Sequence, residues 1–138
     1  MKLTNNFSLE ELVYSETAKV NNIENSFTVD VVNNLYRLCV NILQPVRDNF
    51  KVPVIVSSGY RSKTLNKLVG GVSNSQPLTG EAVDIVVTGA KLRNVYNYIK
   101  HNLKYDQLLF ESSNGNSWIH VSLTDKNNRQ QAIDNFLA

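Results

Sequence analysis

The residues of this chain that could do chemistry gather in one central stretch, residues 57–87. Tyr60 and Arg61 follow a short β-branched run, residues 54–56, which predicts a strand, and loops at strand ends are common positions for functional side chains. Asp84 interrupts a second apolar run that also predicts a strand. A carboxylate there either faces solvent or lies on a partly buried face, where it needs a cation or strong hydrogen-bond donors.

Three motifs of the chain resemble those of a known enzyme family. They are Ser58-Gly59-Tyr60-Arg61-Ser62, then Ser75-Gln76-Pro77-Leu78-Thr79-Gly80-Glu81-Ala82-Val83-Asp84, and finally Trp118-Ile119-His120. This series is similar to the SGYRS, SxHxxGxAxD and WxH motifs of the zinc D-Ala-D-Ala carboxypeptidases and of the bacteriophage endolysins related to them. The resemblance extends through the segment 7–18 and the segment 43–50, so it covers nearly the whole chain.

The resemblance implies a peptidoglycan stem-peptide hydrolase of carboxypeptidase or endopeptidase type, with zinc as its cofactor and the stem peptide as its partner. It also implies an α+β fold of the D-Ala-D-Ala carboxypeptidase, or hedgehog-like, type. Two of the zinc ligands correspond to Asp84 and His120. The first ligand of the family is a His, and Pro77 stands in that position with no side-chain donor atom for a metal. The alternative function is therefore a catalytically inactive wall-peptide-binding or phage structural module on the same scaffold.

Replacement of the missing imidazole by a neighbouring side chain is not convincing. A hydrolytic zinc site needs three protein ligands and an open position for water. Gln76 is a neutral oxygen donor and Ser75 is a poor ligand, while Glu81 lies three positions from Asp84 and is expected to face the opposite side of the strand. Coordination by two residues leaves the metal mainly to water, so we expect zinc affinity to fall by orders of magnitude.

Glu111 is the residue that we name as a catalytic general base. In family members whose site ends in E-x-x-H, a Glu three residues before the His has this role, and Ser117 occupies that position here. A hairpin would place Glu111 at the level of Trp118 on the facing strand and bring it toward His120. The alternative is an ordinary exposed carboxylate at a strand end.

Arg61 and Ser75 correspond to the family residues that hold the end of the substrate peptide. The planar guanidinium of an arginine matches a carboxylate in a bidentate manner. The alternative for Arg61 is a structural ion pair with Asp84 or Glu81. Tyr60 is interpreted as a wall of the substrate cleft rather than as a catalyst.

Length and charge limit the class of protein. The 138 residues fit a single domain, residues 1–138, that can bury a core without disulfides. Fourteen basic and twelve acidic residues give a formal charge of +2 and are scattered along the chain, so nothing indicates a nucleic-acid partner. The single cysteine, Cys39, is predicted to be a buried small hydrophobe.

The chain shows neither the apolar core of a signal peptide nor an apolar run of membrane-spanning length. We therefore expect a monomeric protein without a membrane partner that is made in the cytoplasm. It would meet the cell wall through export by another component, within a phage or wall-associated assembly, or after lysis.

Two helices are predicted before the central stretch. Ser8 and Glu11 form an S-x-x-E capping box for a short helix. Thr28 can cap a long helix with apolar residues at i, i+3, i+4 and i+7 spacing, and Pro45 should bend this helix or end its regular part near Gln44.

The remaining elements complete a mixed fold. Ser62 can cap a short helix that the glycine pair 70–71 stops, and a further helix carries His101 near its end, where the helix dipole favours it. The segments around SSNGNS predict a β-hairpin with a longer loop, and a last helix is predicted from about Asn127, packing Ile133 and Phe136. This order predicts an α+β fold with a small, mainly antiparallel sheet flanked by helices.

Overall fold

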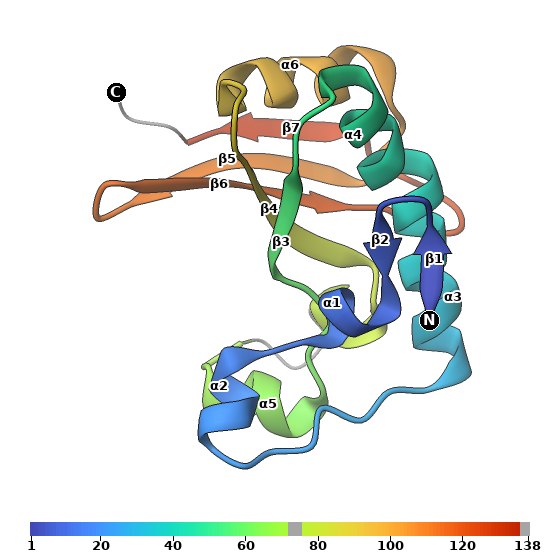
Figure 1. Ribbon diagram of the computed structural model, residues 1–138, viewed down its shortest axis with the longest axis vertical. Helices are drawn as coiled ribbons and strands as arrows, with labels where there is room; N and C mark the ends of the chain where they lie inside the picture. The colour runs from blue at the N-terminus through green and yellow to red at the C-terminus, as the bar shows by residue number, and fades with distance from the viewer. Residues whose placement is uncertain (72–75, 136–138) are drawn as a thin grey trace.

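The computed structural model describes residues 1–71 and 76–135, and its centre is a five-stranded sheet (Figure 1). The order β3-β4-β6-β5-β7 is antiparallel at each junction except β5–β7, which is parallel. The strands are β3 (Val54–Ser58), β4 (Ala82–Val87), β5 (Gln107–Ser113), β6 (Asn116–Ser122) and β7 (Gln131–Asp134). The α+β class with a mainly antiparallel sheet is therefore confirmed.

Helices occupy both ends of this sheet. They are α1 (Leu9–Val13), α2 (Glu16–Val20), α3 (Val29–Leu38), α4 (Gln44–Phe50), α5 (Lys63–Leu68) and α6 (Leu92–Asn102). Figure 1 shows α4 and α6 together at one end of the molecule and α2 and α5 at the other, with β3 and β4 running between them. A separate two-stranded sheet, β1 (Lys2–Thr4) and β2 (Phe7–Ser8), precedes α1. Within residues 1–71 and 76–135, no helix is long and apolar enough to span a membrane.

The strand alternation separates a core face from an open face. Ile119 and Val121 of β6 are fully buried, whereas Trp118 and His120, which point to the opposite side, are only partly buried. The core face packs against α3, α4, the turn of residues 39–43 that joins them, and α6, where the fully buried residues include Leu35, Leu38, Ile42, Leu43, Val46, Val95 and Ile99. The polar residues of the sheet are therefore displayed on its open face.

The long helix is irregular where Pro45 was predicted to disturb it. Thr28 caps α3 by accepting a bond from the Val31 amide, and residues Cys39–Leu43 then form a π-helical turn before α4 begins. Pro45 has no N–H for a bond to the preceding turn, and the Gln44 amide bonds instead to the carbonyl of Cys39, five residues back. The helix is thus disturbed next to Pro45 as predicted, but its regular part ends earlier than predicted, at Leu38, and α-helix resumes at Gln44.

The hairpin is confirmed, but the prediction of a longer loop is wrong. Ser113 pairs directly with Asn116, which leaves a two-residue turn formed by Asn114 and Gly115. Both turn residues have positive φ angles, 53° and 80°, as a type I′ turn requires. The flanking serines and asparagines therefore belong to the strands.

The predicted last helix is also wrong, because this segment forms β7. Gln131 donates a backbone hydrogen bond to Asp106 and Asn135 donates one to Phe110, at 3.0 and 2.8 Å, which bracket the parallel pairing with β5. Ile133 lies opposite Leu109 and is 37% exposed. The partner for this pairing lies about two dozen residues away, so local helical spacing could not indicate it. Phe136 lies outside the described residues.

Asp106, at the start of β5, joins three segments of the chain. Its carboxylate accepts three hydrogen bonds from Arg129, through the backbone amide, Nε and Nη2, at 2.8–2.9 Å. It accepts a fourth from Nε2 of Gln76 at 2.8 Å. The hydrogen bonds from Arg129 are the largest cause that lowers the pKa of Asp106 to about 2. The side chain is only 5% exposed, so this is a buried, fully bonded carboxylate.

Asp106→Asn is expected to lower the free energy of unfolding by about 2 kcal/mol or more at neutral pH. The folded-state pKa lies below that of the unfolded chain, so the charge contributes stability above about pH 4 and loses it as the pH falls toward 2. Urea unfolding at several pH values should therefore show a gap between the two proteins that closes on acidification. Asp125→Asn, at an exposed position, is the control. A gap independent of pH would contradict the charge argument.

Candidate functional site

Asp84 and His120, the two predicted metal ligands, lie side by side on the open face of the sheet. They are direct cross-strand partners on β4 and β6, and Oδ1 of Asp84 is 2.9 Å from Nδ1 of His120. Their side chains are 30% and 22% exposed. The structure therefore brings these two residues together at an accessible position.

Pro77 lies at the third position around the same small cavity, of about 60 Å³, that Asp84 and His120 line. It belongs to a 3-10 turn, Gln76–Thr79. Its carbonyl accepts a hydrogen bond from the backbone amide of Arg61 at 3.1 Å, which fixes the turn against the loop after β3. The side chain of Pro77 adds only carbon to the cavity.

The residues of this site do not fit a zinc centre with three protein ligands. Nowhere in residues 1–71 and 76–135 do three or more His, Cys, Asp or Glu residues form a group that could hold a metal ion. Gln76 is engaged by Asp106, and Glu81 accepts a hydrogen bond from the Thr79 hydroxyl at 2.6 Å. Ser75 lies outside the described residues. Gln76 and Glu81 are thus both engaged by other residues of the chain.

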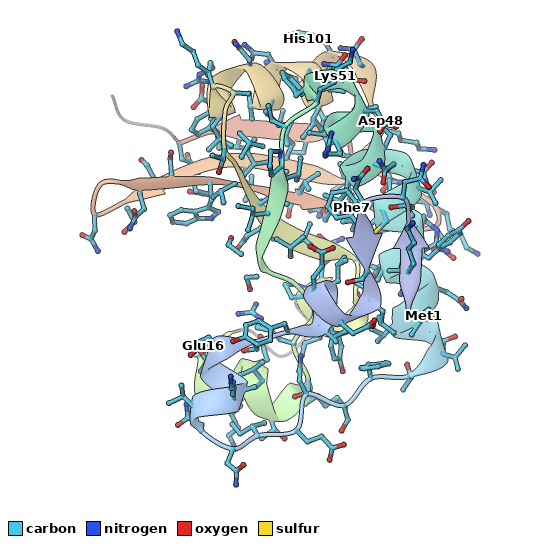
Figure 2. The ribbon with its side chains drawn as sticks, in the orientation of Figure 1. Met1, Phe7, Glu16, Asp48, Lys51 and His101 are labelled. Carbon is cyan, nitrogen blue, oxygen red and sulfur yellow. The ribbon has the colours of Figure 1, made fainter. Side chains whose placement is uncertain are left out.

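His101, the second histidine, is remote from this site. It is exposed near the C-terminal end of α6. Figure 2 shows it at the opposite end of the molecule from Glu16 of α2. Its interpretation as a helix-end histidine is consistent with this position.

Arg61 lines the small cavity, and one nitrogen of its guanidinium is unsatisfied among the described residues. Its Nε is buried and has no hydrogen-bond partner in the described part of the chain. The alternative of an ion pair with Asp84 or Glu81 is not realised among these residues. Because Arg61 lines the small cavity, its guanidinium is suited to bind a ligand that supplies a carboxylate oxygen.

The Arg61 loop is held in place by Asn25, which sequence reasoning did not single out, and by Gly59 of the first motif. Asn25 donates to the carbonyls of Val13 and Tyr60, at 2.8 and 3.0 Å, and accepts from the amide of Ser62 at 2.7 Å. Gly59 lies so close to α1 that a Cβ atom would be 2.1 Å from the carbonyl oxygen of Leu12. The only sequence signal for Asn25 was its place in a polar turn, and its partners are far away in the chain.

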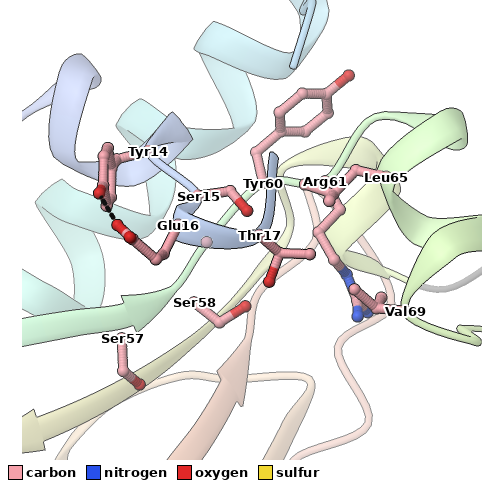
Figure 3. A pocket seen from close by; sticks show the side chains of 11 residues that line it. Tyr14, Ser15, Glu16, Thr17, Ser57, Ser58, Tyr60, Arg61, Leu65 and Val69 are labelled. Carbon is pink, nitrogen blue, oxygen red and sulfur yellow. Dashed lines mark hydrogen bonds between the residues drawn. The ribbon is translucent and has the colours of Figure 1, made fainter. Parts of the chain in front are cut away.

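Tyr60 supports the same loop from its other side. Its hydroxyl donates to the carbonyl of Ser26 at 2.5 Å, and its ring meets Phe27 edge to face with centroids 6.4 Å apart. Burial raises the pKa of its phenol. In Figure 3 the ring points away from the guanidinium of Arg61. Tyr60 is nonetheless among the residues that line the pocket drawn there, and its contact with substrate stays a prediction.

Glu111 lies opposite Trp118 as expected, which places it on the same sheet face as His120. The residue directly opposite His120 is Leu109, so Glu111 is a diagonal neighbour. Its carboxylate accepts a hydrogen bond from Asn135 at 3.2 Å, and it is not among the residues that line the small cavity. Its role as a base stays a prediction.

A larger pocket of about 260 Å³ adjoins the small cavity, and the two share Ser58, Gly59 and Arg61 (Figure 3). Its other walls come from the segment 14–17, from Ser57 and Tyr60, and from Leu65 and Val69 at α5. Arg61 therefore lies where the two hollows meet.

Asn25→Ala is expected to lower the free energy of unfolding by about 1–3 kcal/mol, because it leaves two carbonyls and one amide without their partner. Thermal or urea unfolding measures the loss. Asn21→Ala is the matched control, since the Asn21 amide bonds one carbonyl in an exposed setting. Equal effects of the two substitutions would show that Asn25 does not brace the loop.

One comparison with known proteins identifies the family of this chain. The profile of the family described as Peptidase M15 matches residues 5–122, which include all of the predicted site residues. A search of curated proteins finds no match. The match extends over most of the chain and agrees with the motifs around Arg61, Asp84 and His120. The chain therefore belongs to the Peptidase M15 family, whose members are zinc-dependent peptidases of peptidoglycan.

Proposed function

We propose that this domain binds peptidoglycan stem peptides in the cleft around Arg61, Asp84 and His120 and hydrolyses them poorly or not at all. Family membership supports the peptide as ligand. The observation that carries the loss of catalysis is the presence of Pro77 at the cavity wall, where the family motif has its first zinc ligand. Zinc in a complete site would supply an activated water and polarise the scissile carbonyl.

The Asp84–His120 pair has a role in such a module without a metal. The two side chains bond to each other through Oδ1 and Nδ1. The second carboxylate oxygen and the second ring nitrogen are then available for the peptide groups of a ligand. A peptide laid over β4 and β6 would meet an acceptor and a ring nitrogen on adjacent strands.

Arg61 supplies the strongest expected contact. Its buried Nε lacks a partner among the described residues, and its guanidinium can hold a carboxylate in a bidentate manner. A terminal carboxylate of the stem peptide would bind the guanidinium and neutralise its charge. Ser75, the family's second contact to the peptide end, is included in this proposal.

The proposal also covers the fold type of the domain and the assembly in which it works. The order of the sheet, with helices packed on one face, is compatible with the hedgehog-like fold of D-Ala-D-Ala carboxypeptidases. A module that binds wall peptides without cleaving them suits a phage or wall-associated assembly. The competing function is an active endolysin or carboxypeptidase with Glu111 as base, which family membership favours and which the next experiment separates.

Pro77→His should create a zinc site with three ligands, through the new imidazole, Asp84 and His120. The protein with Pro77 should lose zinc on dialysis, and Pro77→His should retain about one zinc per chain. Removing the proline should cost the fold only about 1 kcal/mol. Metal analysis after dialysis measures the stoichiometry, and Pro77→Ala, which removes the ring without adding a donor, is the control.

Turnover of purified peptidoglycan separates the two functions. Zinc without turnover in Pro77→His would show that a base is also missing, as a binding module requires. Stoichiometric zinc and turnover in the protein with Pro77 would overturn the proposal in favour of the peptidase. Neither zinc nor turnover in Pro77→His would mean that Asp84 and His120 do not form a metal cleft with residue 77.

Arg61→Ala should weaken binding of a D-Ala-D-Ala peptide about tenfold or more, since a charge-assisted hydrogen bond contributes about 1.5–3 kcal/mol. The melting temperature should change little, because the Nε of Arg61 has no partner among the described residues. Calorimetric titration measures the affinity. Arg61→Lys, which keeps the charge without the planar fork, should recover only part of it. Parallel losses of melting temperature and affinity would instead assign Arg61 a structural role.

A further inference from the structure

The larger pocket beside the small cavity has the size of a subsite for one residue. Its volume of about 260 Å³ is below the roughly 300–1,000 Å³ of pockets for drug-sized ligands. It shares Arg61 with the small cavity, so a peptide bound at Asp84 and His120 could place a neighbouring residue in it. The pocket is therefore a candidate for selecting one side chain of the bound peptide.

The walls of this pocket combine apolar surface with one carboxylate. Leu65 is buried and Val69 is 44% exposed, and together they line the α5 side. Glu16 lines the opposite, α2 side, where the hydroxyl of Tyr14 donates a hydrogen bond to its carboxylate. Figure 3 shows this pair on one side of the pocket and the guanidinium of Arg61 on the other. The pocket thus offers one anion and one cation on separate walls.

These features favour a ligand residue with a positive end on an apolar stem. Within residues 1–71 and 76–135 Glu16 forms no ion pair, and its hydrogen-bond partner is a neutral phenol. A ligand ammonium would meet this carboxylate, whereas an acidic side chain would be repelled by it. The methylene groups of such a side chain would lie against Leu65 and Val69, as long cationic side chains do on apolar surfaces.

We propose that this pocket selects a diamino acid residue of the stem peptide that carries a free side-chain ammonium, with Glu16 as its acceptor. This inference rests on the proposed peptide-binding function. Tyr14 is a positioning residue, since its hydrogen bond orients the carboxylate. Arg61 then holds a carboxylate of the same peptide at the junction of the two hollows.

The test uses calorimetric titration with two peptides that end in D-Ala-D-Ala and differ only at one lysine, free in the first and Nε-acetylated in the second. The free amine should bind about two- to fivefold more tightly at low salt, the range for an exposed ion pair. The difference should shrink as the salt concentration rises, because exposed charges are screened.

Glu16→Gln should abolish the discrimination and leave the affinity for the acetylated peptide unchanged. Glu24→Gln makes the same charge change at an exposed residue outside the pocket lining and should keep the discrimination. Equal affinity of the native protein for both peptides, or discrimination that survives Glu16→Gln, would overturn the subsite while the peptide-binding function stands. Binding of neither peptide would overturn the peptide-binding function, and the subsite with it.

Discussion

The arrangement of the site depends on the hydrogen bonds that the buried carboxylate of Asp106 accepts. It binds Gln76, the residue directly before Pro77, and also Arg129, which precedes β7. Its own backbone amide donates to the carbonyl of Ser122 at the end of β6, at 2.7 Å. One side chain therefore fixes the turn over the cavity relative to the strands that carry the site. In a complete zinc centre the metal would itself tie this turn to the strands, whereas here protein hydrogen bonds hold it.

The position of Asp84 and His120 follows from the period of a strand. Both residues alternate with buried neighbours, so both point to the open face, and the antiparallel register makes them direct partners. Arg61 lies at the same cavity for a different reason, because it follows the end of β3. The close approach of Gly59 to α1 and the bond between the Arg61 amide and the Pro77 carbonyl bend the chain after β3 toward the cavity. The loop after β3, the 3-10 turn of Pro77, β4 and β6 thus meet at the small cavity.

Helix-capping signals in the sequence are reliable, whereas contacts between residues that are distant in the chain are not visible in it. Ser8 and Ser62 cap their helices as predicted, because each bond joins residues three positions apart. The last strand was read as a helix because its identity depends on parallel pairing with β5, and the chain near Ile133 shows no strong alternation. Asp106 was not foreseen for the same reason. Its partners Gln76 and Arg129 are 30 and 23 residues away, and only the fold brings them together.

The backbone around Pro77 explains how the fold can be kept without the metal ligand. Proline is tolerated in the first turn of a helix, where the N–H has no intrahelical partner, and Pro77 is the second residue of the 3-10 turn. The group that the structure uses at this position is the carbonyl, which accepts from the amides of Arg61 and Gly80 at 3.1 and 3.4 Å. Every residue type has that carbonyl. The packing of the turn and the chemistry of the cavity are therefore separable at residue 77, so a proline at this position is compatible with the observed arrangement of Arg61, Asp84 and His120.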